Sequence, residues 1–332
     1  MSGRCPLSII ITIYNDAEAL TEFLSRILAQ KAKDFEVVVV NNGSSDSTVD
    51  VCENYRKADP RVIVVHMDLG TPAEAYNNGL QAATGRYVHF ANPADSIADG
   101  ALENISPILR HNLDVIFLES PHPSFWDINH ASVLRRLCTS LPDKLWDKLI
   151  RRELLTKYDI TFSKGIVWEE VDFCINLYLH ATSYNSIDFP YYQQGPKETL
   201  SRDPDAVFSR GVLTLSKWAG PAESTFEEYS TIIHSWMVAI YCDILLPTYS
   251  QLPKEARNLY RAGMGDFKWL LLDNRKNQML KILYIVCGPY ITSLLIQYEN
   301  RYVPSAKATG VFQFVHKKVN LITAYCRTRI GR

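Results

Sequence analysis

Four consecutive valines at residues 37–40 lead directly into the polar segment 41–48. A strand without polar alternation is typical of a sheet covered by helices on both faces, as parallel sheets are. Ligands of such sheets bind where the strands end, and Gly43 lets the backbone approach a ligand closely or adopt a positive φ. The sequence therefore predicts a buried strand that opens onto a binding loop.

Strand and helix patterns alternate from residue 7 to residue 90. This alternation predicts a mostly parallel, doubly wound α/β sheet, whose commonest type of ligand is a nucleotide. Pro72 fits the first turn of the third helix, and we expect Gly85 to end that helix. The strand patterns lie at residues 7–13, 37–40, 61–66 and 86–90, and the helical patterns at 17–30, 46–58 and 72–83.

Composition and the absence of certain motifs narrow the class of protein. The 332 residues are 47% hydrophobic and 21% charged, with a net charge of -1, which gives no reason to expect nucleic acid as a partner. Seven cysteines without CxxC or zinc-ligand spacing indicate reduced core thiols, and the amino terminus lacks an export signal, so we expect a cytoplasmic protein. No GxGxxG or GxxxxGK[ST] motif follows a strand, which argues against NAD enzymes and P-loop NTPases.

Five motifs occur in a fixed order between about residues 6 and 202. They are Thr-Ile-Tyr-Asn ending the strand at 8–15, Asn-Asn-Gly-Ser-Ser-Asp at 41–46, Ala-Tyr-Asn-Asn-Gly leading to Gly-Arg-Tyr-Val at 75–88, Leu-Trp-Asp-Lys-Leu at 145–149, and Trp-Glu-Glu-Val-Asp-Phe at 168–173. In this order they resemble the motifs of the family 2 glycosyltransferases. The resemblance implies the GT-A fold, a Rossmann-like and mostly parallel sheet flanked by helices, and transfer of a sugar from a nucleotide-sugar donor with inversion.

The resemblance implies a donor site at the ends of the first strands. Asn41 and Asn42 replace an acidic pair that reaches the nucleobase in the family. An amide both donates and accepts hydrogen bonds, so it suits uracil or, when flipped, cytosine. The alternative is that both asparagines only satisfy a tight turn. The full set of expected donor-binding residues is Thr12, Tyr14, Asn15, Asn41, Asn42, Asn77, Asn92 and Asp95.

The family's Asp-x-Asp motif, which holds a divalent metal against the donor diphosphate, corresponds here to residues 92–95. Asn92 and Ala94 replace two acids, and Asp95 alone keeps a carboxylate. Mn²⁺ and Mg²⁺ prefer hard oxygen ligands, so metal dependence is doubtful, with Asp95 as the remaining candidate ligand. The alternative role of Asp95 is a helix cap ahead of Ile97. A chain with this motif must use protein cations, tolerate a poorer metal site, or accept a CMP-linked donor with only one phosphate.

Glu170 occupies the position of the family's catalytic aspartate, next to Glu169. Both glutamates begin a helix whose buried stripe is predicted to contain Val171, Cys174 and Tyr178. A carboxylate held there could remove the proton of the acceptor hydroxyl as its oxygen attacks the sugar. The alternative is that these acids only complement the helix dipole.

The acceptor and leaving-group sides are indicated by isolated residues. Trp126 and Trp168 could stack on sugar faces, although either could equally be a core residue. Lys197 or Arg202 could offset charge on a departing diphosphate, and the alternative is a solvated loop charge. His122 and His130 lack zinc-ligand spacing, and we assign them no role.

Apolar residues recur at helical spacing from about residue 206 onward. We therefore expect a catalytic domain at 1–205 and a C-terminal α-helical extension at 206–332. Residues 279–298 are marginal for a membrane span, because Lys281 and the pair Gly288 and Pro289 interrupt them. A buried helical hairpin and an interfacial helix making peripheral membrane contact remain the alternatives.

Our main hypothesis is an inverting glycosyltransferase that moves a sugar, most plausibly from a UDP-sugar, to a hydroxyl of a glycan or lipid-linked glycan. The setting implied by the family is synthesis of a bacterial surface polysaccharide, such as capsule or lipopolysaccharide, at the inner face of the membrane. The alternatives are a catalytically impaired GT-A-fold module that binds sugar nucleotides or glycans, and a transferase that uses a CMP-linked donor. The sequence leaves the sugar, the linkage and the formation of a homo-oligomer open.

Overall fold

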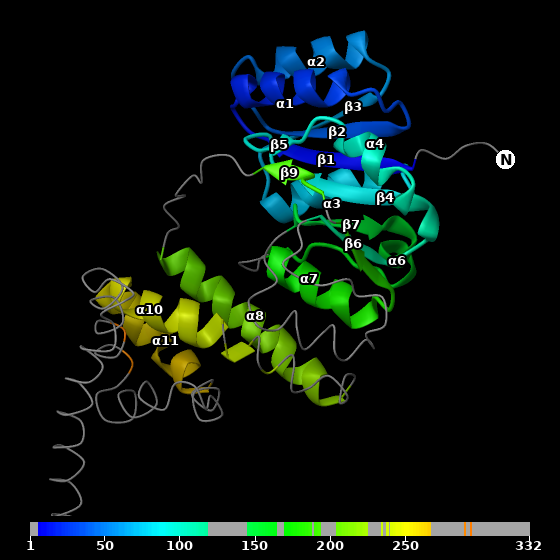
Figure 1. The fold of residues 1–332 in the computed structure, drawn as a ribbon. Coiled ribbons are helices and arrows are strands. Elements are labelled where there is room, and N and C mark those ends of the chain that lie inside the picture. Colours follow the sequence, from blue (N-terminus) through cyan, green and yellow to red (C-terminus); the bar gives the residue numbers. More distant parts are fainter. Residues whose placement is uncertain are drawn as a thin grey trace, which may run out of the picture. The chain divides into compact units, whose positions relative to one another are not determined.

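The structure is a computed structural model that describes residues 6–118, 145–164, 169–187, 189–193, 204–224, 234, 237–238, 240–266, 289 and 293. The chain divides into two compact units, residues 1–200 and 201–332. The first unit is the α/β unit, and it carries every predicted site residue that the structure describes (Figure 1).

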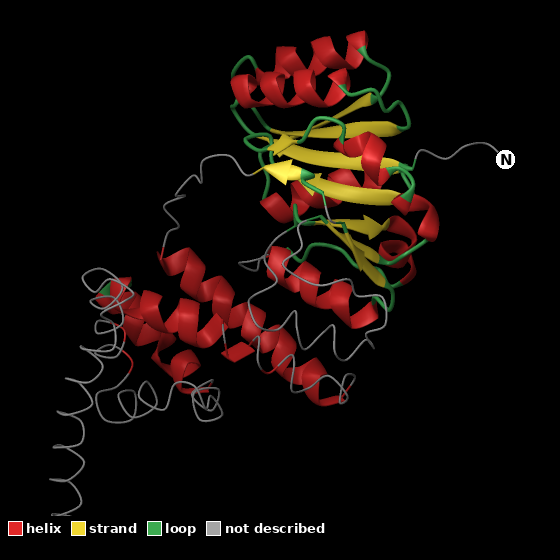
Figure 2. Ribbon diagram, viewed as in Figure 1, coloured by secondary structure: helices red, strands yellow, loops and turns green. Residues whose placement is uncertain are grey.

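A seven-stranded sheet forms the centre of the first unit, with the strand order β3-β2-β1-β4-β7-β6-β8. The first four strands pair in parallel, and β7 is antiparallel to both of its neighbours, whereas β8 is parallel to β6. The expected mostly parallel sheet flanked by helices is thus confirmed (Figure 2). The strands are β1 Leu7–Ile13, β2 Phe35–Asn42, β3 Val62–Met67, β4 Tyr87–Ala91, β6 Val115–Phe117, β7 Lys148–Arg151 and β8 Tyr184–Ser186, and a separate two-stranded sheet pairs β5 Ser96–Ile97 with β9 Tyr192–Gln193.

Helices cover both faces of the sheet, which explains why the valine strand has no polar alternation. Side chains of α1 (Ala17–Ala29) and α2 (Thr48–Ala58) share one hydrophobic cluster with alternate residues of β1 and β2, such as Ile9 and Val37. On the opposite face α3 (Pro72–Ala82) approaches so closely that a Cβ added at Gly79 would lie 2.4 Å from Cγ2 of Ile10. The other helices of this unit are α4 Ala101–Ile105, α6 Arg152–Lys157 and α7 Glu169–His180.

Helix ends follow the predicted signals in part. Pro72 lies in the first turn of α3, where Thr71 and Glu74 form a reciprocal capping box. The prediction that Gly85 ends this helix is wrong, because α3 ends at Ala82. Gly85 instead packs against β1, where an added Cβ would lie 2.5 Å from Oγ of Ser8.

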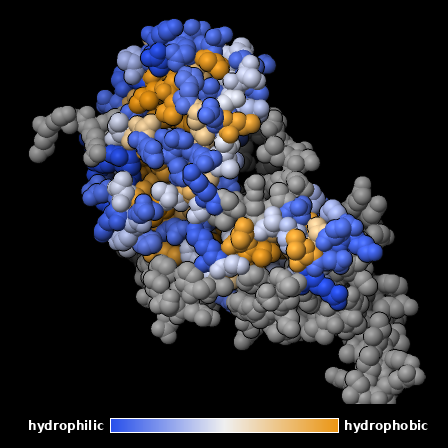
Figure 3. Space-filling view, turned by 180° about the vertical axis from the view of Figure 1, so that it is seen from behind, coloured by the Kyte–Doolittle hydropathy of each residue, from blue (hydrophilic) through white to orange (hydrophobic). Residues whose placement is uncertain are grey.

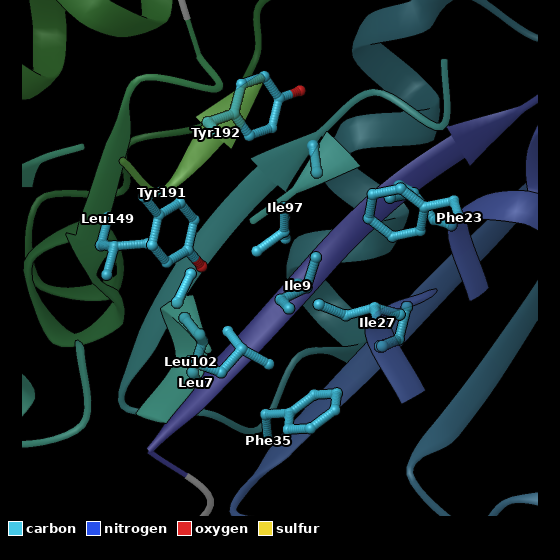
Figure 4. Close-up of a cluster of buried hydrophobic side chains, with 14 of the residues drawn as sticks. Leu7, Ile9, Phe23, Ile27, Phe35, Ile97, Leu102, Leu149, Tyr191 and Tyr192 are labelled. Atoms are coloured by element: carbon cyan, nitrogen blue, oxygen red, sulfur yellow. The ribbon is translucent and has the colours of Figure 1, made fainter. Parts of the chain in front are cut away.

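Buried apolar side chains from β1, α1 and β2 meet those of β5 and β9 in one cluster (Figure 4). Tyr191 and Tyr192 are adjacent in the chain, and Figure 4 shows the hydroxyl of Tyr191 directed into the cluster and that of Tyr192 directed away from it. The short strands β5 and β9 therefore anchor Tyr192 beside the carboxyl ends of the parallel strands.

His89 of β4 is a buried histidine that should make stability depend on pH. Burial lowers its pKa from 6.5 to about 4, and its Nε2–H donates to the carbonyl oxygen of Trp146 at 3.0 Å. The folded chain keeps the imidazole neutral, so its contribution is complete above pH 6.5 and is lost as the pH falls toward 4, by up to about 3 kcal/mol. We expect the free energy of unfolding, measured by urea denaturation, to fall between pH 6.5 and pH 4 more steeply in the native chain than in His89→Phe. Equal slopes in the two chains would contradict this assignment.

The second unit is helical in its described residues. It contains α8 Pro204–Ser224, a π-helical stretch Ile240–Leu245, α10 Leu246–Thr248 and α11 Lys254–Asp266. Within the described part of the chain, no helix has the length and apolar character needed to cross a membrane. Residues 279–298 lie outside the described residues apart from Pro289 and Ser293.

Hydrophilic side chains predominate on the face of the described residues that Figure 3 shows, with smaller apolar patches between them. The described cysteines, Cys52, Cys174 and Cys242, are buried and form no disulfide with one another, as predicted for core thiols.

Candidate functional site

The parallel strands β1 to β4 end at one edge of the sheet. Ile13 of β1 is in register with Asn41 of β2, and Ile11 is in register with Ala91 of β4. The chain turns to opposite sides of β1 in forming β2 and β4, and such a switch point is where ligands of α/β sheets bind. The ends of β1, β2 and β4 carry all the predicted donor-binding residues except Asn77, which lies on α3.

The two asparagines of the β2 turn point to opposite faces of the sheet, because side chains alternate along a strand. The Asn41 amide lies on the α2 side, where its Nδ2 is 3.0 Å from Nδ1 of His66 and its Oδ1 accepts from the Ser44 backbone N–H at 3.1 Å. Nδ1 of His66 must accept from this amide, so its Nε2 carries the proton that bonds Glu53 of α2 at 3.1 Å. Asn41 is 3% exposed, and its visible contacts are those of a turn-forming residue.

Asn42 lies on the α3 side and holds the loop between β3 and α3. Its Oδ1 accepts from the Gly70 backbone N–H at 2.8 Å, and its Nδ2 donates to the Gly70 carbonyl at 3.2 Å. Gly43 follows with φ 73°, and a Cβ there would lie 2.4 Å from the backbone nitrogen of Leu69. Only glycine therefore permits this approach of the two loops without displacing one of them.

Asn15 connects the loop after β1 to the loop after β2. Its backbone N–H donates to Oγ of Ser44 at 3.0 Å, and its Oδ1 accepts from the Ser45 N–H at 2.8 Å. Asn15 has φ 49°, a left-handed conformation that asparagine tolerates. The adjacent Tyr14 is 51% exposed, so its ring is available to a ligand at this edge.

Tyr76 of α3 joins the strand edge to the helix that carries the predicted base. Its ring packs edge-on to Phe90 of β4 at 5.5 Å and lies 4.7 Å from the ring of Phe162. Burial raises the pKa of Tyr76, the charges of Glu170 and Glu169 raise it further, and a hydrogen bond with the Thr12 side chain opposes them. The hydroxyl therefore lies between the end of β1 and the first turn of α7, and it remains protonated at neutral pH.

Hydrogen bonds and an ion pair of residues 162–164 link α3 to the start of α7. Asn77 of α3 donates to the Phe162 carbonyl and accepts from the Phe162 N–H, both at 2.9 Å. Lys164 pairs with Glu74 at 3.0 Å. Oγ of Ser163 donates to Asp172 of α7 at 2.7 Å. The amide nitrogen and the amide oxygen of Asn77 are thus both hydrogen-bonded within the chain. Its expected contact with the nucleotide-sugar donor stays a prediction.

The predicted base, Glu170, and its neighbour Glu169 lie in the first turn of α7. Both residues are partly buried. The predicted stripe of Val171, Cys174 and Tyr178 is buried, as expected. The ring of Phe173 stacks on that of Phe162 at 4.1 Å and 3°, so a rigid aromatic contact holds the first turn of this helix.

The turn at residues 92–95 offers a divalent cation one carboxylate, that of Asp95. Oδ1 of Asn92 accepts from the Ala94 N–H at 3.1 Å, and Oδ2 of Asp95 accepts from the Tyr192 hydroxyl at 2.5 Å. Among the described residues no three His, Cys, Asp or Glu side chains are grouped as metal ligands. The alternative role of Asp95 as a helix cap is wrong, because β5 and not a helix follows it.

Four other predicted residues lie outside the described part of the chain. They are Trp126 and Trp168 on the acceptor side and Lys197 and Arg202 on the leaving-group side. The sequence assigned no role to Tyr76, which lies in the motif at 75–88, or to Tyr192, which lies outside the five motifs. No local signal indicates that Tyr192 pairs with a turn so far away in the sequence.

A groove of about 750 Å³ lies along the outer side of α3 and α6. Asn77 is the one predicted site residue in its lining, which otherwise includes Gln81, Arg152 and Thr156. Its size suits a small ligand, but the candidate acid-base and donor-binding groups converge at the strand ends. We therefore place the candidate active site at the edge of the sheet and not in this groove.

Comparisons with known proteins identify relatives of this chain. Residues 8–164 match the model of glycosyl transferase family 2. The chain is 25% identical over 205 residues to the uncharacterized glycosyltransferase EpsJ of Bacillus subtilis, covering 56% of this chain and 60% of EpsJ. It is 26% identical over 263 residues to the cholesterol galactosyltransferase of Borreliella burgdorferi, covering 71% of this chain and 73% of that protein.

The fold is shared with a solved structure. Residues 1–349 of TarS from S. aureus, in complex with UDP-GlcNAc, superpose with a TM-score of 0.68 at 21% identity, covering 89% of this chain and 91% of that one. The sheet order, the flanking helices and this superposition establish the expected GT-A fold. The match of residues 8–164 to glycosyl transferase family 2, together with the glycosyltransferase relatives, identifies the chain as a glycosyltransferase.

Proposed function

We propose that this protein transfers a sugar from a nucleotide-sugar donor to a hydroxyl group of a glycan or glycolipid, with inversion at the anomeric carbon. The observation that carries the proposal is the aromatic contact between the donor edge and the helix of the predicted base: Phe90 of β4 packs edge-on to Phe173 of α7 at 5.8 Å and to Tyr76 of α3 at 5.5 Å. This contact supports placing the two glutamates of α7 beside the ends of the parallel strands.

Glu170 is the general base in this proposal. Its carboxylate takes the proton of the acceptor hydroxyl while that oxygen bonds to the anomeric carbon and the nucleotide leaves from the opposite side. The bond to the leaving phosphate oxygen breaks in the same displacement, so no covalent enzyme intermediate forms. The fastening of α7 through Asp172 and Phe173 holds the base in place, which is what reaction in a defined geometry requires.

The donor nucleotide is placed at the ends of β1, β2 and β4. The exposed ring of Tyr14 offers a stacking surface, and the hydrogen bonds of Asn15 and Asn42 preorganise the surrounding loops. UDP is the nucleotide we propose, because TarS shares the fold and binds UDP-GlcNAc. The cholesterol galactosyltransferase, which is 26% identical over 263 residues, supports an acceptor hydroxyl on a lipid.

We assign transfer to residues 1–205 and contacts with acceptor, membrane surface or another copy to residues 206–332. Both relatives come from bacteria, which supports a bacterial setting, and a surface glycan is the acceptor that we propose there. Because of the residues at positions 92–95, the proposed reaction includes no step that depends on a divalent ion.

Calorimetric titration of the full chain with UDP, GDP, CDP and CMP tests the donor assignment. We expect UDP to bind at least about tenfold more tightly than the other nucleotides, a difference of about 1.4 kcal/mol. Preferred binding of CMP or CDP would overturn the UDP assignment in favour of a cytidine-linked donor. UDP binding without turnover of any UDP-sugar would instead indicate a module that binds sugar nucleotides without transferring them.

A further inference from the structure

The turn at residues 92–95 is closed by hydrogen bonds to a side chain almost a hundred residues away. The Tyr192 hydroxyl donates to Oδ2 of Asp95 at 2.5 Å and accepts from the Asn92 backbone N–H at 3.1 Å. A short hydrogen bond to an ionised acceptor is stronger than a neutral one. The single carboxylate of this turn therefore has a specific partner supplied by the protein.

The ring of Tyr192 is fixed on several sides. It stacks on Trp146 with ring centroids 5.0 Å apart and planes 10° apart, and it lies edge-on to His89 at 5.8 Å. Its strand β9 pairs with β5, which begins immediately after Asp95, in the registers Ser96 with Gln193 and Ile97 with Tyr192. Both the donor and the acceptor of this bond are thus held by the same small sheet.

A divalent cation would find few ligands in this arrangement. Mg²⁺ can be held by one or two carboxylates together with substrate phosphates, so Asp95 alone could in principle serve. The hydrogen bond from Tyr192 lowers the basicity of the Asp95 carboxylate and so weakens it as a ligand. Asn92, whose Oδ1 accepts from the Ala94 N–H, would have to leave its turn to act as a second ligand.

We propose that Asp95 serves Tyr192 and not a cation, so that this chain binds its nucleotide equally well with and without Mn²⁺ or Mg²⁺. Tyr192 and Asp95 act as positioning residues that keep the end of β4 in the shape that a metal would otherwise impose. Burial raises the pKa of the Tyr192 phenol, so it stays a hydrogen-bond donor at neutral pH. The nucleotide part of this inference rests on the proposed function.

Two measurements test the inference on the full chain. The first is binding of Mn²⁺ alone, followed by the electron paramagnetic resonance signal of the free ion, and the second is calorimetric titration with UDP in EDTA and in millimolar Mn²⁺. We expect the native chain to leave the Mn²⁺ signal unchanged and to bind UDP with affinities within about twofold in the two buffers, a free-energy difference below about 0.5 kcal/mol.

Variants of the turn make the test sharper. Ala94→Asp restores a second carboxylate, and Tyr192→Phe releases Asp95, so the double variant is expected to bind Mn²⁺ and to gain at least about tenfold in UDP affinity when Mn²⁺ is added. Asp95→Asn in the native background should leave the ratio of the two UDP affinities unchanged. Thermal unfolding of each variant confirms that it is folded before titration.

Two outcomes would overturn the inference: depletion of free Mn²⁺ by the native chain, and tightening of UDP by about tenfold or more in Mn²⁺ that Asp95→Asn abolishes. Failure of UDP to bind in either buffer would count against the proposed function. The inference would then be decided by the Mn²⁺ signal of the native chain and the double variant.

Discussion

Glu170→Gln is expected to lower the rate of sugar transfer by about 10²- to 10⁴-fold, the range that a general base contributes. Glutamine keeps the size and hydrogen-bonding capacity of the side chain but cannot take the acceptor proton. Glu170 begins a helix that is fastened through Ser163, Asp172 and the Phe162–Phe173 stack, so the substitution should leave the surrounding geometry intact. Steady-state kinetics with a UDP-sugar, together with calorimetric UDP binding, measure the two effects separately.

Three variants sharpen this test of the base. Glu170→Asp should keep part of the activity, because the shorter acid is the residue of the family motif at this position. Glu169→Gln should cost less than Glu170→Gln if Glu170 is the base. Glu153→Gln is a matched control on α6, where the Glu153 side chain is 76% exposed, and it should leave the rate unchanged. Turnover of Glu170→Gln within about tenfold of the native rate would remove this residue from the role of base.

Glu36→Ala is expected to destabilise the first unit by about 3 kcal/mol, because it leaves the buried Ser8 hydroxyl without an acceptor and removes two hydrogen bonds from the more exposed Thr84. The Glu36 carboxylate accepts from the Ser8 hydroxyl at 2.5 Å, from the Thr84 N–H at 2.6 Å and from the Thr84 hydroxyl at 2.7 Å. Ser8 in turn accepts from the Gly85 N–H at 2.8 Å. This network joins the starts of β1, β2 and β4 at the edge opposite the candidate site.

Urea denaturation followed by circular dichroism measures the loss. Glu36→Gln retains one acceptor oxygen and should cost less than the alanine variant. Glu22→Ala on α1 is the matched surface control, since the Glu22 side chain is 66% exposed and its pair with Arg26 is an ordinary surface contact. Equal losses for Glu36→Ala and Glu22→Ala would show that the network does not stabilise the sheet. UDP affinity should be unchanged in Glu36→Gln, because the network is remote from the donor edge.

Sequence patterns determined the elements whose cause is local. The apolar residues 7–13 and the valines 37–40 form buried strands because every side chain on both faces meets a helix. The helix from Pro72 is defined by Thr71, Glu74 and the proline itself, which act within one turn. Motif order also placed Thr12 and Glu170 in one unit and identified its family.

Tertiary structure alone decided the pairings between distant segments. The sequence around Lys148 does not indicate that β7 runs antiparallel between β4 and β6. The two residues of β5 pair with Tyr192 and Gln193 only because both segments meet beside Asp95. The opposite directions of Asn41 and Asn42 follow from strand alternation, but their partners, His66 and Gly70, come from the neighbouring strand and its loop. Short-range propensity and periodicity specify which segments form strands and helices, whereas hydrogen bonds and ring contacts over long sequence separations decide which side chains share a site.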